Sequence, residues 1–123
     1  MPLNLDDNHA SFQIKGFTPG TLKINEETYT RSVIIGANTL ITDWEPQRIG
    51  ELTAAHLAVI IPLAPAILLI GTGETLSFPD MAVYGELINH GIGVEVMNTS
   101  AACRTYTALT AENRQVMAAI FVQ

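Results

Sequence analysis

Two continuous apolar runs restrict the fold of this chain more than any other feature of its sequence. Ala66 to Ile70 is an unbroken aliphatic run, and Val116 to Val122 carries apolar residues at odd and even positions alike. Because successive side chains of a strand point to opposite faces, strands of this kind are covered on both faces. Both runs therefore predict strands inside a sheet, not at its rim.

Helix signals alternate with these strand signals. Thr53 is a suitable N-cap for a helix that we expect to end before Pro62. A second helix is expected from Pro79 to His90, because proline is favoured in the first turn and Gly91 stands where a left-handed cap belongs. Four of its apolar residues share one face at helical spacing: Met81, Tyr84, Leu87 and Ile88.

The helix from Pro79 to His90 is long enough to connect parallel strands by a right-handed crossover. We therefore expect Ala66 to Ile70 and Val94 to Met97 to run parallel, with their carboxyl ends at one edge of the sheet. Thr99 or Ser100 can cap a third helix that continues to about Leu109, with Ala102, Tyr106 and Leu109 facing inward. Ligands usually bind at this edge in open α/β sheets. The loop at Gly71 and the start of the third helix should meet there.

The first part of the chain has a different pattern. From Ser11 to Trp44, short β-type runs alternate with turn residues, which predicts a meander of antiparallel strands or hairpins. We expect residues 1–10 to form a flexible arm and residues 11–123 to form a single α/β domain, since 123 residues are too few for two ordinary domains.

Charge and composition exclude several classes of protein. The net charge of −6 repels phosphate backbones and anionic lipids, so we expect no nucleic-acid partner. The longest apolar stretch, Leu57 to Ile70, has 14 residues, whereas a membrane span needs about 20, so no membrane insertion is expected. The single cysteine suits a reducing compartment, and the first ten residues lack a targeting pattern. These features predict a cytoplasmic protein.

Gly71, Thr72 and Gly73 form the first candidate site. They follow a buried strand, and two glycines allow a sharp turn and close approach to a ligand. The dinucleotide-binding fingerprint is incomplete, because Leu76 stands where a third glycine would be needed. A phosphate loop is also incomplete, because its Gly-Lys-Ser/Thr ending is absent. A tight structural turn remains the alternative.

The second candidate site is the predicted start of the third helix. Exposed N–H groups at Thr99 and Ser100, together with the charge of Arg104, make a pocket for a small anion plausible. The alternative is that Arg104 forms a structural ion pair with Glu74, Glu95 or another carboxylate.

Cys103 lies beside this helix start, where a cationic neighbour favours the thiolate. Its alternative role is that of a small buried apolar residue. A cysteine enzyme would need a base, and His56 is the histidine that the topology leaves at the correct edge; Glu74 could assist in acid–base chemistry. No histidine or carboxylate pair has metal-ligand spacing, so neither a metal nor a cofactor is expected.

Three segments of the sequence resemble a known family: Leu68 to Gly73, Gly91 to Met97, and Ala101 to Tyr106 with Glu112 to Arg114 after it. They are similar to the small-domain family of mitochondrial complex I assembly factor 3 and the adipogenesis-associated domain protein. The family motifs match at Gly71, Thr72 and Gly73 and at Cys103 and Arg104.

The resemblance implies a three-layer α/β fold. Its central sheet is mixed and mostly parallel, with five strands, helices on one side and an additional N-terminal antiparallel β layer. Most bacterial-type members have no assigned activity, while the mitochondrial relative assembles a respiratory complex through protein contacts. Two departures stand out: the chain has no mitochondrial presequence, and Thr107 stands where relatives often have Asn.

Two functions remain open at this point. The first is a non-enzymatic binding or assembly module with a protein partner, because the chain lacks a convincing set of nucleophile, base and orienting residue. The second is a small-molecule enzyme or anion-binding protein, with Cys103 or His56 as the chemical group and Arg104 holding an anionic substrate.

Overall fold

The core of the structure is a five-stranded sheet in the order β5-β4-β8-β6-β7. A computed structural model describes residues 8–123. The strands of this sheet are β4 (Val33–Gly36), β5 (Thr39–Ile41), β6 (Ile67–Gly71), β7 (Gly93–Met97) and β8 (Val116–Ile120). The predicted interior position of the last strand is confirmed, because β8 lies between β4 and β6 and all five of its residues are buried.

The sheet is mixed and mostly parallel, as the resemblance implied. β6 runs parallel to both β7 and β8, and β4 runs antiparallel to β8 and to β5. Only β4 therefore runs against the common direction. The register pairs Gly71 with Met97, so the carboxyl ends of β6 and β7 lie at one edge, as predicted. Gly71 also pairs with Ile120, so β8, for which no direction was predicted, ends at the same edge.

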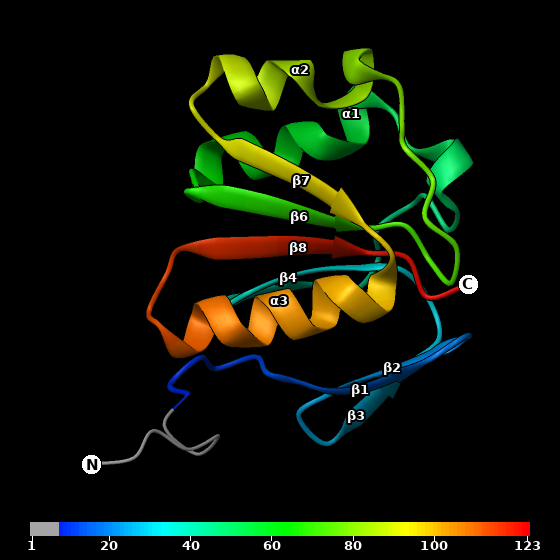
Figure 1. Cartoon of the computed structure of the whole chain (residues 1–123), viewed down its shortest axis with the longest axis vertical. Coiled ribbons are helices and arrows are strands. Elements are labelled where there is room, and N and C mark those ends of the chain that lie inside the picture. The colour runs from blue at the N-terminus through cyan, green and yellow to red at the C-terminus, as the bar shows by residue number, and fades with distance from the viewer. Residues whose placement is uncertain (1–7) are drawn as a thin grey trace.

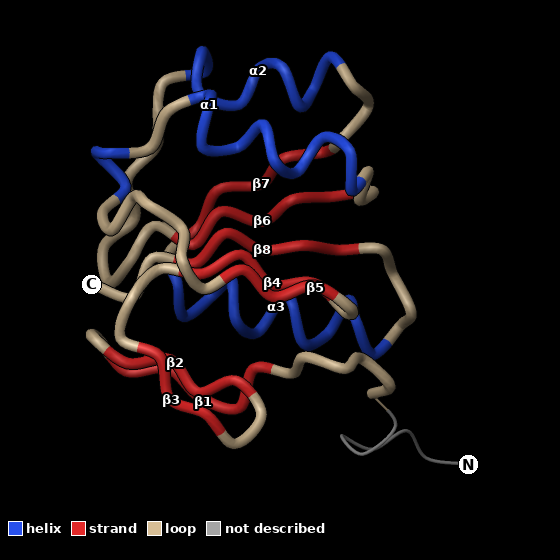
Figure 2. The backbone as a smooth tube through the Cα atoms, turned by 180° about the vertical axis from the view of Figure 1, so that it is seen from behind, coloured by secondary structure: helices blue, strands red, loops and turns tan. Residues whose placement is uncertain are grey.

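Helices cover both faces of this sheet, so the implied placement of helices on one side is wrong (Figures 1 and 2). On one face, Leu68 and Ile70 pack with residues of α1 (Ala54–Leu57), the 3-10 helix η3 (Ala58–Leu63) and α2 (Met81–Asn89). On the other face, Leu69 packs with Tyr106 of α3 (Thr99–Ala111). The reason lies in the sequences of β6 and β8, which place apolar side chains on both faces of the sheet. Both faces therefore have to be covered by other elements.

The meander predicted for the N-terminal part divides between two sheets. β1 (Ile14–Thr18), β2 (Thr21–Ile24) and β3 (Glu27–Tyr29) form a separate antiparallel sheet, whereas β4 and β5 join the central one. Leu22 and Ile24 of the small sheet are buried in the same core as α3. The additional β layer is thus confirmed, and it lies on the side of the central sheet that α3 covers (Figure 1).

The helices before and after β6 differ in detail from the predictions. Thr53 caps α1 as expected, but the helical segment then continues as η3 through Pro62 and ends at Leu63, followed by the C-cap Ala64, whose φ is +47°. A further short 3-10 helix, η2, spans Ile49–Glu51. α2 begins one residue after Asp80, whose carboxylate accepts the N–H of Ala82 at 3.2 Å.

The arm expected over residues 1–10 lies largely outside the described residues. Asn8, the first described residue, is buried against α3, and its amide nitrogen donates to Thr110 Oγ1 at 2.9 Å and to the Thr107 carbonyl at 3.3 Å. The chain is therefore held against α3 from residue 8 onward.

Candidate functional site

The two loops that sequence reasoning brought together do meet, at the junction of β6 and α3. A Cβ atom added to Gly71 would lie 3.0 Å from both Thr99 Oγ1 and Ala102 Cβ. Real Cβ atoms rarely come so close to other heavy atoms, so the helix can approach the strand to this distance only because residue 71 is a glycine. Gly71 is needed for close packing of helix on sheet.

The hydrogen-bonding groups of this junction are occupied by the protein itself. The Gly73 N–H donates to Thr99 Oγ1 at 2.8 Å, and the Thr72 N–H donates to the Met97 carbonyl at 2.9 Å. The Thr99 N–H in turn donates to the Gly73 carbonyl at 2.9 Å. An anion at this loop would need these same N–H groups. The geometry supports the structural turn that was the alternative for the glycine loop.

The start of α3 is capped by Asn98 and not by Thr99 or Ser100, which corrects the predicted cap. Asn98 Oδ1 accepts the Ala101 N–H at 2.9 Å. Both hydroxyls proposed as caps have other partners: Thr99 Oγ1 donates to the Phe121 carbonyl at 2.6 Å, and Ser100 Oγ accepts from Arg104 Nη1 at 2.8 Å. Asn is as good an N-cap as Ser, so sequence alone did not separate the three positions.

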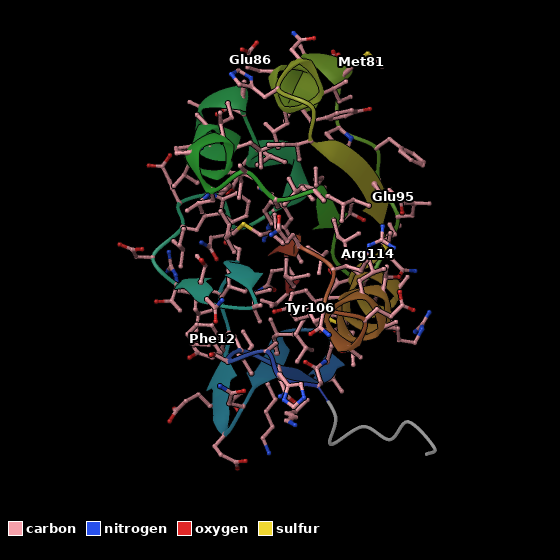
Figure 3. The ribbon with its side chains drawn as sticks, turned by 90° about the vertical axis from the view of Figure 1, so that its left-hand side faces the viewer. Phe12, Met81, Glu86, Glu95, Tyr106 and Arg114 are labelled. Carbon is pink, nitrogen blue, oxygen red and sulfur yellow. The ribbon has the colours of Figure 1, made fainter. Side chains whose placement is uncertain are left out.

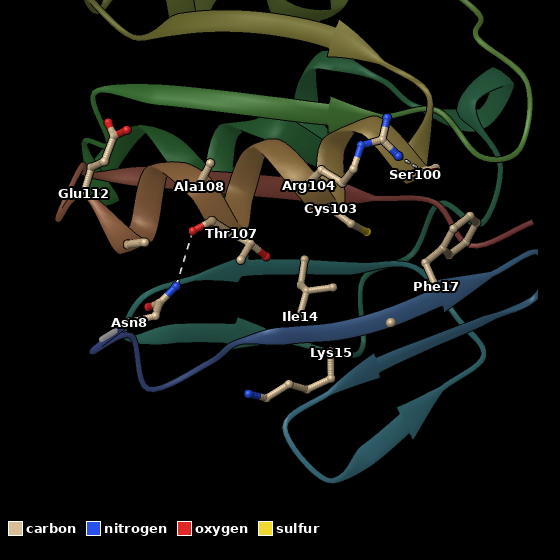
Figure 4. A pocket seen from close by; sticks show the side chains of 12 residues that line it. Asn8, Ile14, Lys15, Phe17, Ser100, Cys103, Arg104, Thr107, Ala108 and Glu112 are labelled. Atoms are coloured by element: carbon tan, nitrogen blue, oxygen red, sulfur yellow. Dashed lines mark hydrogen bonds between the residues drawn. The ribbon is translucent and has the colours of Figure 1, made fainter. Parts of the chain in front are cut away.

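Ser100, Cys103 and Arg104 line a groove between α3 and β1 with a volume of about 680 Å³ (Figure 4). Ile14 reaches into it from β1, and the Cys103 thiol points toward Phe17. We call this the α3 groove. Its lining comprises Asn8, Ile14, Lys15, Gly16, Phe17, Ser100, Cys103, Arg104, Thr107, Ala108, Ala111 and Glu112.

The glycine loop faces a different hollow. Thr72 and Glu74 line a smaller depression of about 290 Å³ together with Arg48, Phe121 and Gln123. The candidate residues are therefore divided between two places on the surface. No hollow described for residues 8–123 is lined by both the glycine loop and Arg104.

Arg104 is exposed, and Ser100 Oγ is its one hydrogen-bond partner in residues 8–123. Over the same residues, no carboxylate lies within 4.0 Å of its guanidinium. Within these residues, the structural ion pair with Glu74, Glu95 or another carboxylate that was its alternative is thus not formed. Its positive charge is available at the rim of the α3 groove.

Cys103 behaves as a buried apolar residue. Burial raises the pKa of its thiol to about 12, and the opposing effect of the Arg104 charge is smaller. A thiol with that pKa is protonated near neutral pH, whereas nucleophilic chemistry needs the thiolate. The environment of Cys103 matches the packing role and not the reactive one.

His56 does not reach the α3 groove. Its Nδ1 accepts the Thr53 N–H at 3.0 Å, and its Nε2 lies 2.9 Å from Glu45 Oε1. Neither partner lines the groove, so His56 is not placed as a base for Cys103. Its side chain completes the cap of α1.

Neither a metal cluster nor a membrane-spanning helix is found in the part of the chain that the structure describes. No group of three or more His, Cys, Asp or Glu side chains within residues 8–123 is placed to hold a metal ion. In the same residues, every helix is too short or too polar to cross a lipid bilayer.

Sequence reasoning missed an exposed apolar surface beside α2. Leu76 and Phe78 in the loop before the helix, and Met81 and Ile88 on the helix, are exposed; we call these four residues the α2 face. The side chain of Phe78 is 71% exposed and that of Met81 65%. Of the four residues predicted to share one face of this helix, only Leu87 is buried. Met81 and Ile88 point outward because Leu87 sets the rotation of α2 against the core.

A family model described as "Protein of unknown function (DUF498/DUF598)" matches residues 14–121. The chain belongs to this family. The DUF498 match spans the small β layer, the central sheet and α3, and it confirms the resemblance drawn from the sequence motifs.

Two curated relatives are similar to this chain over most of its length. A protein of Francisella tularensis named "13 kDa major membrane protein" is 30% identical over 94% of this chain and 95% of its own length. The NADH dehydrogenase [ubiquinone] 1 alpha subcomplex assembly factor 3 of Danio rerio is 33% identical over 90% of this chain. This chain spans 64% of that longer protein.

The solution structure of a Xanthomonas campestris protein shares the fold. It is 34% identical, with a TM-score of 0.83, over 99% of this chain and 92% of that one. The DUF498 fold is therefore found in a solved protein over almost the whole of both chains.

Proposed function

We propose that this protein is a binding module that acts through contact with another protein during assembly of a larger complex. The observation that carries the proposal is the α2 face. The side chains of Phe78 and Met81 are mostly exposed there, whereas the hydrophobic core of the protein is well buried. Large apolar side chains that are exposed near one another in a soluble protein mark interaction sites.

The pattern of α2 itself supports this proposal. Leu87 and Val83 pack toward the core, while Met81 and Ile88, seven residues apart and so on the same side of the helix, face outward. A helix that is apolar on more than one side is usually covered on more than one side. A partner protein would provide the second cover.

The zebrafish relative indicates the kind of complex. It is named an assembly factor of NADH dehydrogenase. We propose that this chain, too, takes part in the assembly of a respiratory complex. We place this action in the cytoplasm, because a lone cysteine suits a reducing compartment. Native gels of a deletion strain, stained for NADH dehydrogenase activity, test the role in assembly, and cell fractionation tests the location.

A capture experiment with matched variants tests the binding function. The protein is immobilised, native extract is passed over it, and bound proteins are quantified for the wild type, for Phe78→Ser/Met81→Gln, and for Ala108→Gln. Ala108 is exposed in the α3 groove, so its variant blocks the other candidate surface. We expect one protein to bind the wild type and Ala108→Gln and to lose binding to the double variant. Equal capture by all three, or loss with Ala108→Gln alone, would contradict the assignment to the α2 face.

A further inference from the structure

The charges of this protein are segregated along its sequence. Its six Lys and Arg residues all lie before residue 49 or after residue 103. The 55 residues between these limits carry five carboxylates: Glu51, Glu74, Asp80, Glu86 and Glu95. This stretch, which we call the acidic segment, contains α1, η3, β6, α2 and β7; it has no Lys or Arg, and its basic side chains are those of His56 and His90.

The acidic segment also bears the α2 face. Met81 and Glu86 lie at the far end of the molecule from Phe12 of the N-terminal layer (Figure 3). Glu74 precedes Leu76 by two residues, and Asp80 lies between Phe78 and Met81. The exposed apolar side chains are therefore flanked by carboxylates.

These carboxylates are exposed, and within residues 8–123 no Lys or Arg nitrogen lies within 4.0 Å of them; Arg48 lines the same depression as Glu74 without pairing to it. Both ion pairs found in residues 8–123 have histidine as the basic partner, and of the five carboxylates only Glu86 takes part, with His90 at 3.4 Å. A negative field that the protein does not neutralise favours partners of opposite charge and repels anionic surfaces.

We infer that the α2 face binds a basic amphipathic helix of a partner protein, with the apolar side of that helix on Phe78 and Met81 and its Lys or Arg residues beside Glu74 and Asp80. The inference rests on the proposed function and names the chemistry of its partner. An exposed helix with an apolar stripe is suited to packing against a second helix. The charges decide against an anionic membrane as the occupant, because its headgroups would face these carboxylates.

The test uses a synthetic 18-residue peptide of Leu and Lys in amphipathic helical order, with a Leu and Glu peptide of the same pattern as its counterpart. Fluorescence anisotropy measures binding to the full chain at low and high salt. We expect the Lys peptide to bind, its affinity to fall with added salt, and the Glu peptide to bind at least about tenfold more weakly, a difference of about 1.4 kcal/mol.

Matched variants locate the site. Glu74→Gln/Asp80→Asn removes two charges beside the α2 face and keeps an N-cap at residue 80, since Asn caps as well as Asp. Glu26→Gln/Glu27→Gln removes two exposed charges from the small sheet. We expect the first pair to weaken Lys-peptide binding several-fold, the second pair to leave it unchanged, and Phe78→Ser/Met81→Gln to abolish it. Equal loss from both charge pairs would overturn the inference, because binding would then follow net charge alone.

Two outcomes separate this inference from the proposed function. If the partner captured from extract is lost with Phe78→Ser/Met81→Gln but kept with Glu74→Gln/Asp80→Asn, the α2 face binds protein and the basic partner is wrong. If vesicles of anionic phospholipid bind the wild type more tightly than the Lys peptide does, and Phe78→Ser/Met81→Gln abolishes that binding, the occupant is a membrane and both proposals fail.

Discussion

The hydroxyl of Thr99, at the first position of α3, accepts the backbone N–H of Gly73 at 2.8 Å, across 26 residues of sequence. The same hydroxyl donates to the Phe121 carbonyl at 2.6 Å, so one buried side chain links β6, α3 and the chain after β8. The family motif at the glycine loop therefore has a structural role that needs no ligand.

Replacing Thr99 with Val should destabilise the protein strongly. Valine has nearly the same shape but cannot pair with the buried Gly73 N–H or the Phe121 carbonyl, and each unsatisfied group costs about 1–3 kcal/mol. Urea unfolding followed by circular dichroism measures the loss. Thr105→Val, on the same helix but without such bonds, serves as the control, and a loss of equal size there would refute the role of the hydroxyl.

Two glycines should respond in opposite directions to the same substitution. Gly71→Ala places a methyl group 3.0 Å from Thr99 Oγ1 and Ala102 Cβ, and we expect it to destabilise the fold by about 1–3 kcal/mol. Gly85 lies within α2 with no atom within 4 Å of an added Cβ, so Gly85→Ala should stabilise by about 0.5–1 kcal/mol. Thermal unfolding of both variants checks the pair. Similar shifts in Tm would contradict the close approach at Gly71.

Strand identity was predictable because it depends on local apolar patterns. The runs around Leu68 and Ala118 are apolar on both faces, and this required covered, interior strands. The parallel register and the meeting of Gly71 with Thr99 followed from the length of the intervening helix. The face of the sheet that each helix covers could not be predicted. A strand that is apolar on both faces needs cover on both, but its pattern does not show which helix covers which face.

The site was harder to predict because its side chains point in directions that local patterns leave open. Arg104 and Thr72 are near in the topology, yet a helix start and a strand end expose different sides, and the two residues line different hollows. On α2, Met81 and Leu87 are both apolar, so helical spacing did not show which would be buried. The run from residue 49 to 103 without Lys or Arg was visible in the sequence and was the signal for the acidic segment.

Cys103 should react slowly with thiol reagents at neutral pH. Burial raises its pKa from 9.0 to about 12, which lowers the thiolate fraction near pH 7 roughly thousandfold. The rate with iodoacetamide should rise about tenfold per pH unit between pH 7 and 10, while protein unfolded in urea reacts at the rate of a free thiol. A rate in the native protein equal to that of free cysteine would restore the case for a reactive thiol.

The same pKa shift predicts how stability changes in alkaline solution. The unfolded thiol loses its proton near pH 9.0, whereas the folded thiol keeps it to about pH 12. The unfolded state therefore binds fewer protons in this range, and stability that is fully present below pH 9 is lost as pH rises toward 12. Unfolding free energies from pH 8 to 11 should fall less steeply for Cys103→Ala than for the wild type. Parallel curves would show that Cys103 does not titrate differently in the two states.

Tyr106 should hold the N-terminal segment against α3. Its hydroxyl donates to the Phe12 carbonyl at 2.8 Å across 94 residues, while its ring is buried in the core that the small sheet and the central sheet share. Tyr106→Phe keeps the ring and removes the bond, so we expect a loss of about 0.5–1.5 kcal/mol. Hydrogen exchange should become faster around residues 12–24, because the lost bond joins that segment to the rest of the fold. Exchange that increases equally in β6 and β8 would indicate a general loss of stability and not a local tether at Tyr106.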